Sequence, residues 1–277
     1  MKSIITAEEL KALLNEENLI LLDARTGKDA RKNYLENHIK GARFIDLDEH
    51  MAEIGEDPAF GGRHPLPTPQ KFSETLANLG ITEGSKIVVY DTSNGANAAA
   101  RCWWMMKAAG FEVGVLSGGL QAAEDSGVEM SSGEEIITKA NNINLTEWKL
   151  PTSTIDEIED GLKDKTVTVI DVRDAYRYNG ESEPIDLIAG HIPGAYNIPF
   201  SENLDEQGNF LSPEILKMKY SEFFKDNPEK TIIHCGSGVT ACHTILAMHY
   251  AGMAIPELYV GSWSEWSRRN KPMASEN

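Results

Sequence analysis

Short apolar runs alternate with helical patterns along the chain. Two of these runs, Asn18–Arg25 (NLILLDAR) and Thr166–Arg173 (TVTVIDVR), are rich in aliphatic residues and end in Asp-x-Arg. A second pair is Lys86–Asp91 (KIVVYD) and Lys230–Cys235 (KTIIHC). Each run predicts a buried strand that leads into a turn, because it is short and its residues are mostly β-branched or apolar.

These strands belong to an internal repeat. Each half also carries a His-Ile-x-Gly-Ala segment, at His38–Ala42 and His191–Ala195. A helical stretch follows the second strand of each half and closes at Gly110 and Gly252. Since the matches occur in the same order in both halves, the sequence predicts a duplicated domain.

The alternation of strands and helices predicts the fold class. It indicates an α/β protein in which each domain is a mainly parallel sheet flanked by helices. The stretch from Ala123 to Pro151 is rich in Ser, Gly, Glu and Asn and has little periodicity, as at the end of a domain followed by a linker. We expect a first domain over residues 1–130, a linker over 131–150 and a second domain over 151–277.

The net charge and the cysteine count of the chain indicate which partners it can bind and in which compartment it works. The chain of 277 residues is 41% hydrophobic and has a formal net charge of −17. Such a charge disfavours nucleic acid and anionic membranes, and it requires a locally basic site for any small anion. The N-terminal residues do not resemble a signal peptide, and no apolar run is long enough to span a membrane. With only three cysteines, which suits a reducing compartment, we expect a cytoplasmic protein.

The candidate chemistry lies in the loop that begins at Cys235. This cysteine ends an apolar strand, and a helical pattern starts near Thr240. Ligands bind at that edge of an open parallel sheet. Gly236 and Gly238 let the loop curl, so that backbone N–H groups, those of Val239 and Thr240 among them, surround an anion at the start of the helix. Such a field favours a thiolate, which predicts that Cys235 is a nucleophile.

The other two cysteines fit a different interpretation. Cys242 lies in the helix that follows the loop, and Cys102 lies in an apolar Cys-Trp-Trp-Met-Met run. We expect both to be core residues. No Cys-x-x-Cys or His-x-x-x-His spacing accompanies the cysteines, so no metal site and no cofactor is expected.

The stretch CGSGVTAC at Cys235–Cys242, with GSWSEW at Gly261–Trp266, resembles the tandem rhodanese-type sulfurtransferases. Within that family it is most similar to the 3-mercaptopyruvate branch. The resemblance covers nearly the whole chain and implies two rhodanese-like domains, of which only the second is catalytic. Asp91 stands where the first copy would need a cysteine, so the first domain is expected to be a scaffold.

The resemblance also implies a mechanism and roles for particular residues. Cys235 would take sulfur from a small anionic donor, release pyruvate and hold a persulfide until a small thiol, a thioredoxin-like protein or cyanide removes it. Arg177 matches the family arginine that binds the donor carboxylate. Ser237 stands where thiosulfate-preferring relatives carry a basic residue. It could form a Ser-His-Asp arrangement with His64 and Asp46.

Several alternatives remain open from the sequence. The mercaptopyruvate branch carries a second arginine after Glu-Pro, but here that position is Ile185, with Arg101 as a possible substitute. Thiosulfate is therefore an alternative donor, and a non-enzymatic persulfide carrier or redox sensor is a further alternative. A rhodanese-like phosphatase would need Cys-x5-Arg, and Ala241 occupies the arginine position.

Overall fold

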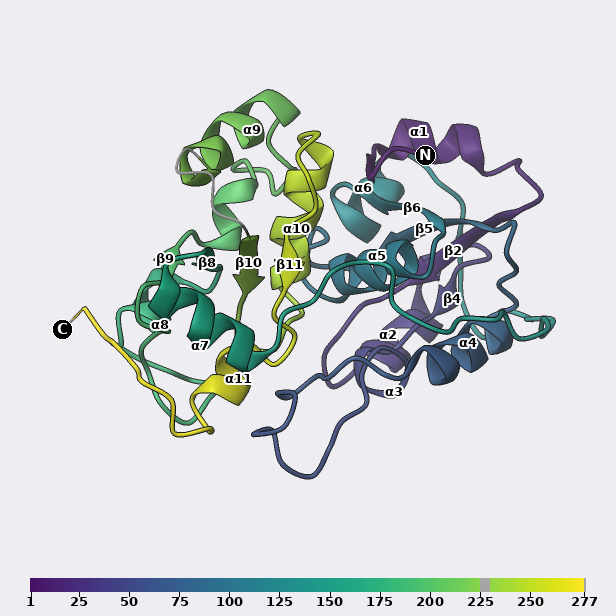
Figure 1. Cartoon of the computed structure of the whole chain (residues 1–277). Coiled ribbons are helices and arrows are strands. Elements are labelled where there is room, and N and C mark those ends of the chain that lie inside the picture. The colour runs from purple at the N-terminus through teal and green to yellow at the C-terminus, as the bar shows by residue number, and fades with distance from the viewer. Residues whose placement is uncertain (225–229, 277) are drawn as a thin grey trace. The chain divides into compact units, whose positions relative to one another are not determined.

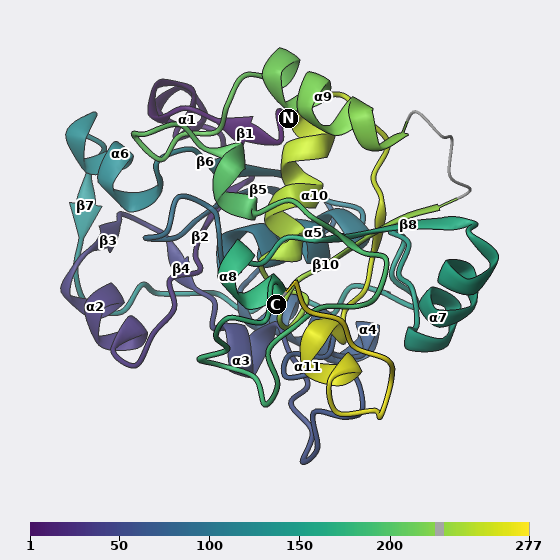
Figure 2. The same ribbon diagram turned by 90° about the vertical axis from the view of Figure 1, so that its left-hand side faces the viewer.

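The structure is a computed structural model that describes residues 1–224 and 230–276. The chain divides into two compact units, drawn in Figures 1 and 2. Unit 1 comprises Met1–Ala52 and Pro67–Lys149, and unit 2 comprises Glu53–Leu66 and Leu150–Asn277.

Unit 1 contains a parallel five-stranded sheet with the order β1-β6-β5-β2-β4. Its strands are β1 (Ile4–Ile5), β2 (Leu19–Asp23), β4 (Arg43–Phe44), β5 (Lys86–Tyr90) and β6 (Glu112–Leu116). A separate antiparallel pair joins β3 (His38–Ile39) to β7 (Met130–Ser131). The helices are α1 (Ala7–Leu13), α2 (Ala30–Glu36), α3 (Leu47–His50), α4 (Pro69–Asn78), α5 (Ala98–Ala108) and α6 (Gly119–Asp125).

Unit 2 repeats this topology. Its parallel sheet has the order β11-β10-β8-β9, with the strands β8 (Val167–Asp171), β9 (Tyr196–Asn197), β10 (Lys230–His234) and β11 (Glu257–Leu258). Thr152 bridges to Leu258 in parallel, at the position that β1 holds beside β6. His191 bridges to Ala274 as His38 does to Ser131.

The helices of unit 2 flank its sheet. They are α7 (Ile155–Asp164), α8 (Ala175–Tyr178), α9 (Pro213–Ser221), α10 (Ala241–Tyr250) and α11 (Ser262–Trp266), with short 3₁₀ helices at Phe200–Asn203 and Glu222–Phe224. Helix α7 packs on β8, and α9 lies beside α10 (Figures 1 and 2). The predicted fold class of two related α/β domains with mainly parallel sheets is confirmed.

Local sequence explains why the two copies start alike. Thr6 and Thr154 each cap a helix by accepting from the N–H of Glu9 and Glu157, whose side chains accept from the N–H of the threonine. Such reciprocal caps satisfy backbone donors that a helix start would leave unpaired. The same threonine-glutamate spacing in both halves therefore positions the first helix of each unit.

The Asp-x-Arg motif has a structural role in both units. Arg25 donates to both carboxylate oxygens of Asp23 and to the carbonyl of Asn37. Arg173 makes the matching bonds to Asp171 and to the carbonyl of Gly190. These buried pairs tie the end of a central strand to the loop that precedes the outer strand.

Two segments pack with a different part of the chain than the predicted domain bounds imply. Residues 131–149 belong to unit 1, where the Lys149 N–H donates to the Ala108 carbonyl and Trp148 lies against Phe72. Residues 53–66 belong to unit 2, although the chain leaves unit 1 at Ala52 and returns to it at Pro67. Both differences arise from long-range contacts, which leave no local sequence pattern.

Candidate active site

Cys235 follows directly after β10 and is held by the first two residues of α11. The Cys235 N–H donates to the Ser262 hydroxyl at 3.2 Å, and the Cys235 carbonyl accepts from the Trp263 N–H at 3.0 Å. The cysteine residue is 3% exposed. Its backbone is therefore fixed at the carboxyl edge of the sheet, directly before the start of α10.

The loop after Cys235 needs glycine at position 238. Gly238 has φ +73°, and an added Cβ atom would lie 2.5 Å from the Val260 carbonyl oxygen. A side chain there would meet both backbone strain and a backbone clash. In the described residues, the N–H groups of Gly236, Ser237 and Val239 have no hydrogen-bond acceptor.

The matching loop of unit 1, which begins at Asp91, binds a carboxylate through its backbone N–H groups. Asp91 follows β5 as Cys235 follows β10, and its carbonyl accepts from Leu120 N–H. The Asp91 carboxylate accepts from the N–H groups of Ser93, Gly95 and Ala99. Burial raises the pKa of Asp91 although these N–H groups oppose the rise. The loop of the first copy thus wraps N–H donors around an acidic group of its own.

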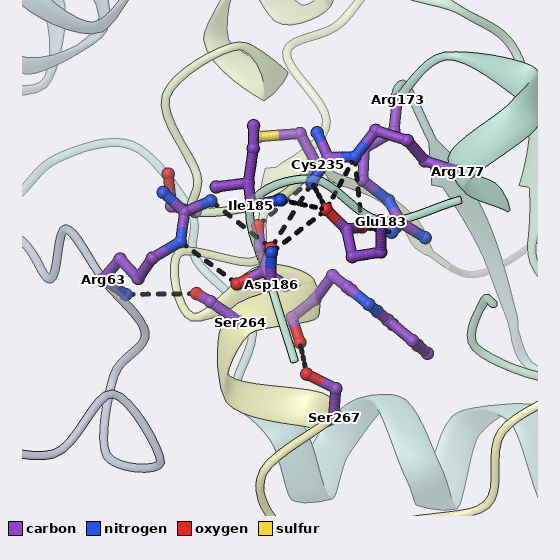
Figure 3. A network of polar contacts seen from close by, with 12 residues as sticks. Arg63, Arg173, Arg177, Glu183, Ile185, Asp186, Cys235, Ser264 and Ser267 are labelled. Carbon is purple, nitrogen blue, oxygen red and sulfur yellow. Dashed lines mark hydrogen bonds and ion pairs between the residues drawn. The ribbon is translucent and has the colours of Figure 1, made fainter. Parts of the chain in front are cut away.

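A network of arginines and carboxylates adjoins Cys235 (Figure 3). Arg177 donates to both oxygens of Glu183, with its shortest contact at 2.7 Å. Arg173 reaches the same carboxylate at 3.2 Å. Burial alone would raise the pKa of Glu183, but Arg177 and two backbone N–H groups hold that pKa below its usual value. Glu183 is therefore an anion that fixes both arginines.

Asp186 forms the second centre of this network. Its carboxylate accepts from Arg63, Arg177 and Arg268. Arg63 and Arg177 also border the cysteine loop, because a Cβ atom added to Gly236 would lie 2.9 Å and 3.4 Å from their Nη2 atoms. The guanidinium groups of Arg63, Arg173, Arg177 and Arg268 are four cations, and their partners Asp171, Glu183 and Asp186 are three anions, so the network has a net positive charge. The acidic chain thus has a basic site beside its candidate nucleophile.

A small pocket opens beside the sulfur-bearing residue. Its volume is about 40 Å³, and its lining is Val172, Arg173, Asp174, Arg177, Phe200, Cys235, Gly236 and Thr240. The lining combines the cysteine, two arginines and the start of α10. This pocket can hold only a small ligand group, and its charge suits an anion.

Residues 53–66 bring two further side chains to the cysteine loop. The Gly61 N–H donates to Glu265, and the Arg63 N–H donates to the Ser264 hydroxyl. Gly62 has φ +80°, and a Cβ atom there would lie 2.4 Å from the Gly261 carbonyl oxygen. This close approach places His64 Nδ1 2.8 Å from the Ser237 hydroxyl oxygen.

The structure places the remaining predicted site residues as follows. Asp46 lies in unit 1, where its carboxylate caps α3 by accepting from the N–H groups of Asp48 and Glu49. Ile185 is 56% exposed, and its N–H donates to Glu183. Arg101 is fully buried in unit 1 and donates to the Met51 carbonyl. Cys102 and Cys242 are buried as expected, and burial raises the pKa of Cys102 well above its usual value.

Sequence reasoning did not single out Arg63 or Asp186 as site residues. They are 123 positions apart in the chain, and neither lies in a recurring local pattern. The one local signal is the Glu183-Pro184-Ile185-Asp186 segment, which has two acidic residues next to the position of the missing arginine.

Comparison with known proteins identifies the family. A model described as a rhodanese-like domain matches the chain twice, over residues 6–126 and 154–269. The chain belongs to the rhodanese family. The two matches agree with the repeated topology and with the predicted duplication.

Full-length relatives of this rhodanese-family chain are named as sulfurtransferases. It is 37% identical to a probable 3-mercaptopyruvate sulfurtransferase of Pseudomonas aeruginosa, over 95% of this chain and 94% of that protein. It is 36% identical to the 3-mercaptopyruvate sulfurtransferase of Mus musculus, over 96% of this chain and 91% of that protein. A thiosulfate sulfurtransferase of Mus musculus is 35% identical over 88% and 82%. The prediction that the chain is a sulfurtransferase is confirmed.

Solved structures agree with this assignment. The chain matches the 3-mercaptopyruvate sulfurtransferase of Leishmania major with a TM-score of 0.84 and 29% identity, over 96% of this chain and 74% of that chain. It matches a 3-mercaptopyruvate sulfotransferase of Escherichia coli with a TM-score of 0.81 and 28% identity, over 96% and 100%. Among the described residues, no helix is long and apolar enough to cross a membrane.

Proposed function

We propose that this sulfurtransferase moves sulfur from 3-mercaptopyruvate to an acceptor through a persulfide on Cys235. The observation that carries the proposal is that Cys235 lines one pocket with Arg173 and Arg177, and begins a loop whose N–H groups at Gly236, Ser237 and Val239 have no acceptor among the described residues. The names of the relatives support the same donor. Unit 1, with Asp91 in the matching loop, would be the non-catalytic copy.

The first half-reaction uses the thiolate of Cys235 as the nucleophile. It attacks the donor sulfur, so that a sulfur–sulfur bond forms and the carbon–sulfur bond of the donor breaks. The electron pair of that bond stays on carbon as an enolate, which takes up a proton to become pyruvate. The N–H groups of Gly236, Ser237 and Val239 would stabilise the negative charge on the thiolate and then on the persulfide.

Ser237 and His64 would act on the donor carbonyl. The serine hydroxyl, hydrogen-bonded to His64, would donate to the carbonyl oxygen as the enolate forms. Asp46 would complete a Ser-His-Asp arrangement, a role that stays a prediction. Gly238 and Thr240 would shape the loop and the pocket around the reacting sulfur.

Arginine side chains would bind the donor carboxylate. Arg177 lines the pocket with Cys235, and Arg63 borders Gly236. A guanidinium group can bind a carboxylate through two parallel hydrogen bonds. Because Arg101 is buried in unit 1, Arg63 is a better substitute for the arginine that Ile185 does not supply.

The second half-reaction returns the enzyme to its starting state. A small thiol, a thioredoxin-like protein or cyanide would attack the outer sulfur of the persulfide and release the Cys235 thiolate. Such alternation between two enzyme forms gives ping-pong kinetics. We further propose that the protein works in the cytoplasm, in keeping with its low cysteine content.

Thiosulfate is the second candidate donor. Relatives that carry that name are 34–35% identical to this chain, and Ile185 stands in place of an arginine. Thiosulfate is also a small anion that the same arginines could bind.

Thiocyanate formation from cyanide would distinguish the two donors. We expect kcat/KM for 3-mercaptopyruvate to exceed that for thiosulfate by at least about tenfold, which corresponds to about 1.4 kcal/mol. Cys235→Ser should give no turnover with either donor. A preference for thiosulfate would overturn the proposed donor, and turnover by Cys235→Ser would overturn the proposed nucleophile.

A further inference from the structure

Asp186 is the carboxylate of this network that accepts from the most arginines. Its carboxylate is 0% exposed and accepts from three guanidinium groups. Arg63 bonds to both of its oxygens, at 3.1 Å and 3.4 Å. Arg177 bonds to Oδ2 at 3.4 Å, and Arg268 bonds to Oδ1 at 3.2 Å. A buried carboxylate with this many charged donors orders every group that it contacts.

One oxygen of Asp186 accepts from both arginines that border the cysteine loop. The Nη2 atoms of Arg63 and Arg177 both lie 3.4 Å from Oδ2, and both lie near Gly236. The two arginines come from segments that are more than a hundred residues apart. The two guanidinium groups nevertheless share one acceptor oxygen near Cys235 (Figure 3).

The negative charge of Asp186 also offsets the repulsion among the three arginines around it. Like charges at such short separations repel strongly when they are shielded from water. Without an anion between them, Arg63, Arg177 and Arg268 would move apart. Arg63 has the greatest freedom to do so, because its side chain is 25% exposed, against 9% for Arg177 and 14% for Arg268.

We propose that Asp186 is a positioning residue, which sets the geometry of the arginine pair that binds the donor carboxylate. This inference rests on the proposed function. The Glu183–Asp186 segment would then not supply an arginine of its own. It would instead orient arginines from the 53–66 segment and from α8.

The direction in which Asp186→Asn changes KM distinguishes two roles for Asp186. It could position the arginines, or it could act only through its charge on the attraction of the anionic donor. Asp186→Asn removes a negative charge and makes the site more positive. If the site attracted donors only by its net charge, KM for an anionic donor would fall. If Asp186 positions the arginines, KM should rise, because a carboxylate needs correctly placed donors for two parallel bonds.

The experiment measures kcat and KM for 3-mercaptopyruvate in wild type, Asp186→Asn and Asp186→Glu. Asp186→Glu keeps the charge but lengthens the side chain by one methylene group. We expect KM to rise about tenfold in both variants, the loss of about 1.4 kcal/mol of binding. Since Cys235 and its N–H donors are unchanged, kcat should stay within about twofold.

A matched control removes the same charge outside the network. Glu181 is exposed and accepts from the side chain of Asn179, so Glu181→Gln should leave KM unchanged. Near-ultraviolet circular dichroism would verify the folding of each variant. If Asp186→Asn does not fold, Asp186→Glu alone decides, because an unchanged KM in it would overturn the inference.

The outcomes separate the inference from the proposed function. A lower KM in Asp186→Asn with an unchanged KM in Asp186→Glu would overturn positioning and leave the donor assignment intact. Wild-type protein that does not turn over 3-mercaptopyruvate would overturn both. A raised KM in both variants, with kcat retained, would support both.

Discussion

At the scale of single residues, the site combines a nucleophile, a polar pair and a set of arginines. Cys235, Ser237 and Arg177 were accessible to sequence reasoning, because they lie within or near recognisable local patterns. Their partners were not. His64 bonds to Ser237 across 173 positions, and Arg63 bonds to Asp186 across 123, so only the folded chain brings them together.

The Ser237–His64 pair leads to a prediction about donor choice. Ser237→Ala should lower kcat/KM for 3-mercaptopyruvate by about 100-fold, because the hydroxyl would no longer stabilise the developing enolate. Thiosulfate has no carbonyl, so its turnover should change by less than about threefold. Parallel assays with both donors make this comparison. Equal losses with the two donors would show that Ser237 supports the loop rather than the carbonyl chemistry.

A buried histidine next to the nucleophile makes folding sensitive to pH. Burial lowers the pKa of His234, although Asp171 opposes the shift. In the unfolded chain, histidine has a pKa of about 6.5. As the pH falls below that value, the unfolded state takes up the proton first, so stability that is present above pH 6.5 is lost. His50, whose pKa is also lowered by burial, acts in the same direction.

Urea unfolding at pH 7 and pH 5 tests this effect. The free energy of unfolding should be lower at pH 5, by up to about 1.4 kcal/mol per pH unit for each such histidine. His234→Gln should reduce the difference between the two pH values. An undiminished difference in that variant would show that His234 does not contribute to it.

At the scale of elements, the sequence predicted the strands that carry the site. The apolar runs before Asp91 and Cys235 are β5 and β10, and the Asp-x-Arg runs are β2 and β8. Their burial on both faces of a parallel sheet makes them largely apolar, and this signal is local. The packing of residues 53–66 with unit 2 could not be predicted, because it depends on contacts such as that of Gly62 with Gly261.

The cysteine loop should depend on glycine at position 238. Gly252 provides a matched control, because it has φ +72° but no atom within 4 Å of an added Cβ. Gly252→Ala should cost about 1 kcal/mol of stability from its left-handed backbone alone. Gly238→Ala adds a clash with the Val260 carbonyl and should cost about 3 kcal/mol. Equal losses in thermal or urea unfolding would contradict the tight packing of this loop.

At the scale of the whole molecule, duplication has produced two units with one topology and two kinds of loop. The loop of unit 1 encloses the Asp91 carboxylate, and the loop of unit 2 begins with Cys235. The fold class was accessible from the repeated motifs, and the family and the sulfurtransferase assignment were accessible from the resemblance carried by Cys235–Cys242 and Gly261–Trp266. The bounds of the compact units were not accessible from the sequence, since they depend on where distant segments pack.

Asp91 should stabilise the protein without taking part in turnover. Asp91→Ala leaves three N–H donors, two of them buried, without their acceptor, so it should lower the free energy of unfolding by about 2–3 kcal/mol. The folded variant should still form one persulfide per chain. Loss of persulfide formation in a variant that remains folded would assign the first unit a part in the chemistry.

A single-turnover reaction with 3-mercaptopyruvate and no acceptor tests the central claim most directly. Pyruvate release is measured, and peptide mass spectrometry locates the transferred sulfur. The account predicts one pyruvate per chain and one additional sulfur atom on the peptide that contains Cys235. Absence of the pyruvate burst, or sulfur on Cys102 or Cys242 instead, would contradict it.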